Sequence, residues 1–87
     1  MKVSLQVAET LKALHPGASK DLRRALDDLD AGKRRDVRAL RHPLVGYYRL
    51  RVGKSRVIFR VDAATGEIRA EFLDRRETVY KSVGKPE

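Results

Sequence analysis

The spacing of apolar residues changes along the first third of the chain, and each spacing predicts a different element. Residues Lys2–Val7 alternate between apolar and polar, which predicts a short strand. Two leucines three residues apart precede a Pro-Gly pair, which predicts a short helix over residues 8–14. A longer helix is predicted from an N-cap at Ser19 to a stop at Gly32, because its apolar residues recur at i, i+3, i+4 and i+7: Leu22, Ala25, Leu26 and Leu29. The two helices are expected to form an antiparallel hairpin.

Alternation returns in the second half of the chain and predicts three more strands. They span Tyr47–Val52, Arg56–Val61 and Glu67–Leu73. The turns between them, "GKS" and "DAATG", each contain a glycine where a positive φ can be needed. Residues 33–45 have no strong period and are predicted to be a loop or a partial strand. The fold class is therefore α+β in one domain, residues 1–87: a short N-terminal strand, a helical hairpin and a three-stranded antiparallel meander.

The positive charge of the chain is concentrated in its middle third. Residues 1–31 are balanced, and residues 61–87 are close to balance. Residues 32–60 carry ten basic side chains and a single acid, Asp36, although the whole chain has a net charge of +8. Such a local excess indicates a polyanion or an acidic partner surface, and nucleic acid is the favoured partner. A basic face that only meets solvent is the alternative.

Composition excludes several classes of site. The chain has no cysteine, so it has no disulfide, thiolate metal site or thiol nucleophile. Its two histidines, His15 and His42, are far apart, and His15 beside Pro16 is predicted to be a loop or cap residue. No metal and no cofactor are expected. No apolar stretch is long enough to span a membrane and the N-terminus lacks a secretory apolar region, so a soluble cytoplasmic protein is expected.

The stretch "GYYRLRVGKSRVIFRV" places its arginines in one phase of the alternation. If the apolar phase of each strand faces the helices, four arginines share the open face of the sheet: Arg49, Arg51, Arg56 and Arg60. Like charges opposite each other in a sheet cost stability, which suggests that an anionic ligand binds there. Alternatively, the arginine stems only cover apolar surface.

The same stretch carries a resemblance to a known family. "VGYYRLRVGKSRVIFRVD", followed by "IRAEFLDRRETVY", resembles the RelE/ParE superfamily of bacterial toxin–antitoxin modules. The match runs from Leu40 to Tyr80, about half of the chain, and the predicted helical hairpin agrees with the family's architecture. The resemblance implies a RelE-like microbial RNase fold.

The RelE branch is favoured, and its members cut messenger RNA in the ribosomal A site through attack of the ribose 2′-hydroxyl on the adjacent phosphodiester. Carried over by motif, the resemblance implies five catalytic residues: Arg49, Arg51, Arg56, Arg76 and Tyr80. Arg75 is an alternative to Arg76 as the last-strand cation. The expected RNA-binding residues surround these or follow the second helix: Tyr47, Lys54, Arg60, Arg75, Lys33, Arg34 and Arg35.

The sequence departs from the family pattern at the expected proton acceptor. The best-known RelE branch has lysines where this chain has Arg49 and Arg51. Arginine is always protonated and cannot serve as a base. No Glu–His pair stands at the matching positions either. The base would therefore be Tyr80 or a group outside the chain, and the arginines are expected to act as a phosphate clamp.

The resemblance also implies partners and two alternatives. The expected partners are a cognate antitoxin, the ribosome and its messenger RNA, with operator DNA bound only through the antitoxin complex and no membrane. A ParE-like inhibitor of DNA gyrase has the same fold and would not need the arginines or Tyr80. A non-toxic relic that only binds an antitoxin is the second alternative.

Overall fold

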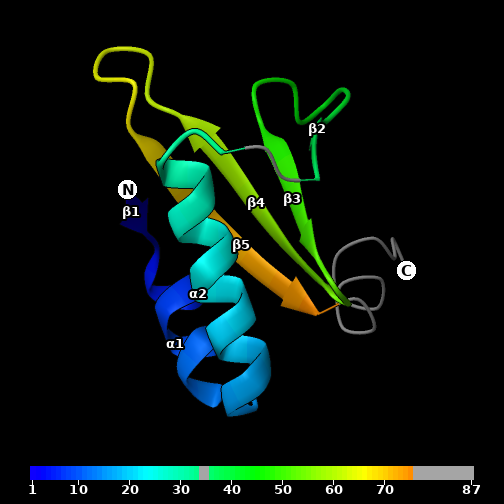
Figure 1. Cartoon of the computed structure of the whole chain (residues 1–87). Coiled ribbons are helices and arrows are strands. Elements are labelled where there is room, and N and C mark those ends of the chain that lie inside the picture. Colours follow the sequence, from blue (N-terminus) through cyan, green and yellow to red (C-terminus); the bar gives the residue numbers. More distant parts are fainter. Residues whose placement is uncertain (34–35, 76–87) are drawn as a thin grey trace.

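The chain folds as an α+β protein in which two helices lie on one face of a five-stranded sheet (Figure 1). A computed structural model describes residues 1–33 and 36–75. In chain order the elements are β1 (Lys2–Val3), α1 (Leu5–Ala13), α2 (Pro16–Asp30), β2 (Val37–Ala39), β3 (Tyr48–Val52), β4 (Ser55–Val61) and β5 (Ile68–Arg75). The predicted fold class is confirmed.

The sheet has the strand order β1-β5-β4-β3-β2. The predicted meander is present, because β4 pairs antiparallel with both β3 and β5. Two edge strands complete the sheet: β1 runs parallel to β5, and β2 pairs antiparallel with β3. The strand β2 lies in the segment for which a loop or a partial strand was expected. Gly53 and Gly66 close the two meander turns at φ of 59° and 76°, which glycine adopts at little cost.

The predicted first strand, Lys2–Val7, is wrong beyond Val3, because α1 begins at Leu5. Ser4 caps this helix: its Oγ accepts a hydrogen bond from Val7 N at 3.1 Å and donates one to Glu71 O at 2.8 Å. Val7 is fully buried in the core, whereas Leu5 is 73% exposed. Alternation over a few residues does not separate a strand from a capped helix start, and here the cap decides.

Beyond the end of β1, Ser4 and Gln6 take over the hydrogen bonding to the backbone of β5. Ser4 N donates to Ala70 O at 2.9 Å. The Gln6 amide then makes two hydrogen bonds to one residue of β5: Nε2 donates to Leu73 O and Oε1 accepts from Leu73 N, both at 2.8 Å. These contacts satisfy backbone groups that an edge strand otherwise leaves unpaired, and they fix the end of β5 against α1.

The second helix also begins earlier than predicted. Pro16 occupies its first turn, and His15 is the N-cap, with Nδ1 accepting from Gly17 N at 3.1 Å. His15 is thus a cap residue, as predicted, while the N-cap at Ser19 is wrong. Ser19 is buried inside the helix and accepts a hydrogen bond from Arg23 Nε at 3.2 Å. A proline at the first helical position costs no backbone hydrogen bond, which allows the earlier start.

The core lies between the helical pair and the sheet. Helix α2 contributes Leu22, Ala25 and Leu26 from the predicted apolar stripe, and the largest fully buried side chains of the sheet are Leu50, Val57 and Leu73. Among the described residues, neither helix combines the length and apolar character of a membrane span.

Candidate functional site

The face of the sheet opposite the helices carries the arginines that the alternation placed there. Leu50 of β3 and Val57 of β4 are both 0% exposed and pair with each other in the core. Neighbouring residues in a strand point to opposite faces, so Arg49, Arg51 and Arg56 project from the open face. The predicted phase of these two strands is confirmed.

Three of the open-face residues form a row across three strands, called here the Arg51–Arg56–Asp74 row. Arg51 of β3 is opposite Arg56 of β4, and Arg56 is in turn opposite Asp74 of β5. Directly opposite residues in an antiparallel pair have Cβ atoms about 4.5–5.5 Å apart. The row therefore places two arginines on neighbouring strands directly opposite each other, with an aspartate opposite Arg56 on β5.

A bulge in β5 determines which residues join this row. The register places Ile58 opposite Phe72 and Phe59 opposite Ala70, which leaves Glu71 without a cross-strand partner. The extra residue reverses the phase of β5, so that Leu73 enters the core and Asp74 joins the open face. Strict alternation would have placed Leu73 outward. The adjacent apolar pair Phe72-Leu73 is the signal that could have revealed the bulge.

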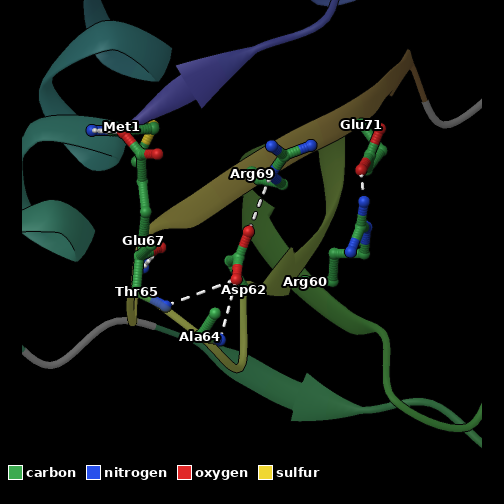
Figure 2. Close-up of polar contacts among 8 residues, drawn as sticks. All are labelled: Met1, Arg60, Asp62, Ala64, Thr65, Glu67, Arg69 and Glu71. Carbon is green, nitrogen blue, oxygen red and sulfur yellow. Dashed lines mark hydrogen bonds and ion pairs between the residues drawn. The ribbon is translucent and has the colours of Figure 1, made fainter.

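Arg60, one of the predicted RNA-binding residues, forms an ion pair within the chain. Its Nε donates to Glu71 Oε2 at 2.7 Å, and the two side chains come from adjacent strands (Figure 2). The hydrogen bond to Glu71 raises the pKa of Arg60. The bulged residue Glu71 thus offsets one of the four arginine charges predicted for this face.

A second ion pair neutralises the same end of the open face. Arg69 Nε lies 3.7 Å from Asp62 Oδ2 (Figure 2). The other carboxylate oxygen of Asp62 accepts hydrogen bonds from the backbone of Ala64 at 2.8 Å and Thr65 at 3.3 Å. These backbone bonds, together with the arginine, lower the pKa of Asp62. These two ion pairs offset positive charge at this end of the open face, whereas Arg51 and Arg56 lie toward the other end, in the Arg51–Arg56–Asp74 row.

Arg49 is partly neutralised and holds strand β3 to the segment before β2. Its Nη2 lies 3.4 Å from Asp36 Oδ1, and its side chain is 14% exposed. Arg51 is exposed, and no carboxylate lies within ion-pair distance of it among residues 1–33 and 36–75. Of the predicted clamp residues, Arg51 is thus the most accessible cation.

The remaining predicted site residues lie around this face or outside the described chain. Tyr47 is half-buried just before β3, and Lys54 is exposed in the turn between β3 and β4. Lys33 lies 3.9 Å from Asp28 at the end of α2 and belongs to the helical layer rather than to the open face. The backbone of Arg75 pairs with Ser55. Four predicted residues lie outside the described residues: Arg34, Arg35, Arg76 and Tyr80.

The residue that the sequence reasoning missed is Asp74. Asp74 is only 3% exposed, and neither of its carboxylate oxygens has a hydrogen-bond partner within the described part of the chain. Burial raises the pKa of Asp74 from 3.8 to about 6, and the charge of Arg56 opposes that rise. The site therefore contains a carboxyl group that changes its charge near neutral pH. No group of three or more residues able to hold a metal ion occurs in the described ranges.

Replacement of Asp74 by asparagine is expected to change the pH dependence of stability. The raised pKa means that the folded chain holds this proton more tightly than the unfolded chain does. This contribution is present below about pH 4 and is lost as the pH rises through 6, and it amounts to at most about 3 kcal/mol. The free energy of unfolding of Asp74→Asn, relative to the wild type, should therefore rise between pH 4.5 and 8 in urea titrations followed by circular dichroism. If the unfolding free energies of the two proteins change with pH in parallel, the raised pKa of Asp74 is contradicted.

Comparisons with known proteins identify the fold. No family model matches the chain, and no curated protein matches it. Among solved structures, the toxin-antitoxin complex RelBE2 from Mycobacterium tuberculosis contains a similar chain, with a TM-score of 0.74 and 24% identity over 86% of this chain and 94% of that one. The RelB-RelE antitoxin-toxin complex from Methanococcus jannaschii gives a TM-score of 0.77 at 16% identity, with 93% and 96% covered. The archaeal RelE-RelB complex from Pyrococcus horikoshii OT3 gives 0.69 at 27% identity, with 86% and 91% covered. The chain thus has a RelE-like toxin fold, which confirms the fold implied by the sequence resemblance.

Proposed function

We propose that this chain is the toxin of a type II toxin–antitoxin module and acts as a ribosome-dependent endoribonuclease on messenger RNA. The observation that carries the proposal is the cross-strand pair of Arg51 and Arg56 on the open face of a fold shared with RelE–RelB complexes. Two arginines in register create a local site for a dianionic group, and their planar donor forks match phosphate oxygens.

The proposed reaction needs no group beyond those that the chain and the ribosome supply. The ribose 2′-oxygen attacks the adjacent phosphorus, and the bond between phosphorus and the 5′-oxygen breaks. The 2′-hydroxyl loses its proton and the 5′-oxygen gains one, which yields a 2′,3′-cyclic phosphate and a 5′-hydroxyl. Negative charge accumulates on the phosphorane oxygens, where Arg51 and Arg56 stabilise it. Arg49 supports the same strand, and Tyr80, outside the described residues, is proposed to contact the nucleotide.

The proposal includes a protein partner that controls the activity. The related complexes contain an antitoxin, and a cognate antitoxin is proposed to cover or deform the basic face of this chain. Operator DNA would be bound through that complex, not by the toxin alone. The proposed substrate is messenger RNA bound to the ribosome. The arginines of the open face can bind its phosphates but do not distinguish its bases.

Induced expression of the chain in a bacterial host, followed by primer extension on translated messages, tests the proposal. We expect growth arrest, new 5′ ends within codons of translated messages, and relief of both by the cognate antitoxin. Loss of supercoiling by purified gyrase without RNA cleavage would instead indicate a ParE-like target. Normal growth together with antitoxin binding would indicate a non-toxic relic.

A further inference from the structure

Asp74 differs from the other carboxylates of the open face in both burial and pairing. Glu71 and Asp62 are half-buried and bind Arg60 and Arg69, respectively. Asp74 is 3% exposed, and its two oxygens have no hydrogen-bond partner among residues 1–33 and 36–75. A buried ionised carboxylate without such bonds lowers the stability of the folded chain. A contribution to folding therefore does not explain an aspartate at this position.

Three described elements surround Asp74 on β5: β4, β3 and α1. On β4, Arg56 is directly opposite, and on β3 the next residue of the row is Arg51. Behind β5, α1 contributes the neutral amide of Gln6, whose two bonds to Leu73 hold the adjacent backbone. Within the described part of the chain, Arg56 and Arg51 are thus the charged side chains in this cross-strand row with Asp74. Among the described residues, Arg56 is the cation whose charge acts on the carboxyl group of Asp74.

We propose that Asp74 is a positioning residue of the anion site: its ionised form draws Arg56 toward β5 and opposes phosphate binding, and phosphate binding at Arg51 and Arg56 brings about its protonation. This inference rests on the phosphate-binding role proposed for the two arginines. An anion at the arginines adds negative charge beside Asp74, and a neighbouring like charge favours the neutral carboxyl form. Binding and proton uptake are then linked, and each strengthens the other.

The linkage has a defined direction in pH. At pH 5 Asp74 is largely neutral, so it does not compete as an anion with phosphate for Arg56. At pH 8 Asp74 is ionised and must take up a proton, or tolerate a nearby anion, whenever phosphate binds. A shift of about one pKa unit on binding corresponds to a tenfold loss of affinity across this range.

Binding of a fluorescent 2′-O-methyl RNA tetranucleotide, which lacks the attacking hydroxyl, tests the proposal by anisotropy at fixed ionic strength from pH 5 to 8. Asp74→Asn should bind as tightly as the wild type at pH 5 and about tenfold more tightly at pH 8. The ratio between the two proteins is the readout, because every other ionisable group is common to both. In the wild type, carboxyl ¹³C resonances should report a higher pKa for Asp74 when the RNA is present.

Glu71→Gln is the matched control, since it makes the same charge change on the same strand and face. It releases Arg60 and should raise affinity equally at all pH values. The Asp74 inference is overturned if Asp74→Asn keeps the wild-type pH profile, or if Glu71→Gln changes the profile in the same way. If Arg51→Ala/Arg56→Ala binds the RNA as well as the wild type, or the wild type binds none, the phosphate site itself is wrong. Circular dichroism melts verify that each variant is folded.

Discussion

Replacing Arg51 and Arg56 together with alanine is expected to lower messenger RNA cleavage in the ribosomal A site by at least about a hundredfold and to abolish growth arrest. The two arginines are directly opposite each other on β3 and β4 and project from the open face. Removal of a single preorganised donor from an oxyanion site typically costs about 10²–10³ in rate. Primer extension on ribosomes programmed in vitro measures the effect directly, with purified protein at equal concentration.

The matched control removes the same charge from the other side of the molecule. Lys12 of α1 and Lys20 of α2 are both exposed on the helical layer, and Lys12→Ala/Lys20→Ala lowers the net charge by the same two units. This variant should cleave like the wild type within a few fold. Equal loss in the two double variants would mean that net charge alone governs ribosome binding, and the phosphate clamp would be refuted.

The Arg51/Arg56 variant should also remain folded. Arg51 is exposed and Arg56 half-buried, and like charges directly opposite each other in a sheet are mutually destabilising. Loss of both charges removes this repulsion, but it also removes the positive charge opposite Asp74. The melting temperature should therefore be close to that of the wild type at pH 5, where Asp74 is largely neutral, and lower at pH 8. If the variant is folded but inactive, the loss of cleavage results from the missing arginines and not from unfolding.

The sequence was sufficient to predict which face of β3 and β4 carries the arginines. Each strand alternates without interruption, so burial of Leu50 and Val57 forces their neighbours outward. The RelE-like fold followed from motifs in the same segment, and the structural likenesses confirm it. Alternation could not predict the charge balance of this face, because Arg60 and Glu71 are eleven residues apart in sequence. They meet only through the pairing of β4 with β5.

Asp74 shows where reasoning from local patterns fails. A bulge shifts the phase of one strand by a single residue, so every side chain after it changes face. In β5 that shift moves Leu73 into the core and Asp74 beside Arg56. The start of α1 failed for a similar reason, since Val3, Leu5 and Val7 fit a strand until the cap at Ser4 is known. In both cases a single hydrogen-bonding feature overrides a short periodic signal.

The largest expected effect on stability comes from Leu50, which anchors β3 between two arginines. Its side chain is 0% exposed and lies in the core opposite Val57. Leu50→Ala removes buried methyl groups and leaves a cavity in a small core, so the free energy of unfolding should fall by about 2–5 kcal/mol. A domain of this size has roughly 5–10 kcal/mol in total, so the variant should be near the limit of folding at 37 °C.

Leu5→Ala provides the reference for the same chemical change outside the core. Leu5 is 73% exposed at the start of α1, so its loss should change stability by no more than about 0.5 kcal/mol. Urea titrations followed by circular dichroism at 222 nm compare the two variants. Because Arg49 and Arg51 flank Leu50, partial loosening of β3 should also weaken RNA binding at temperatures where Leu50→Ala remains folded. Equal unfolding free energies for the two alanine variants would show that β3 is not anchored in the core at Leu50, and the cross-strand placement of Arg51 beside Arg56 would fall with it.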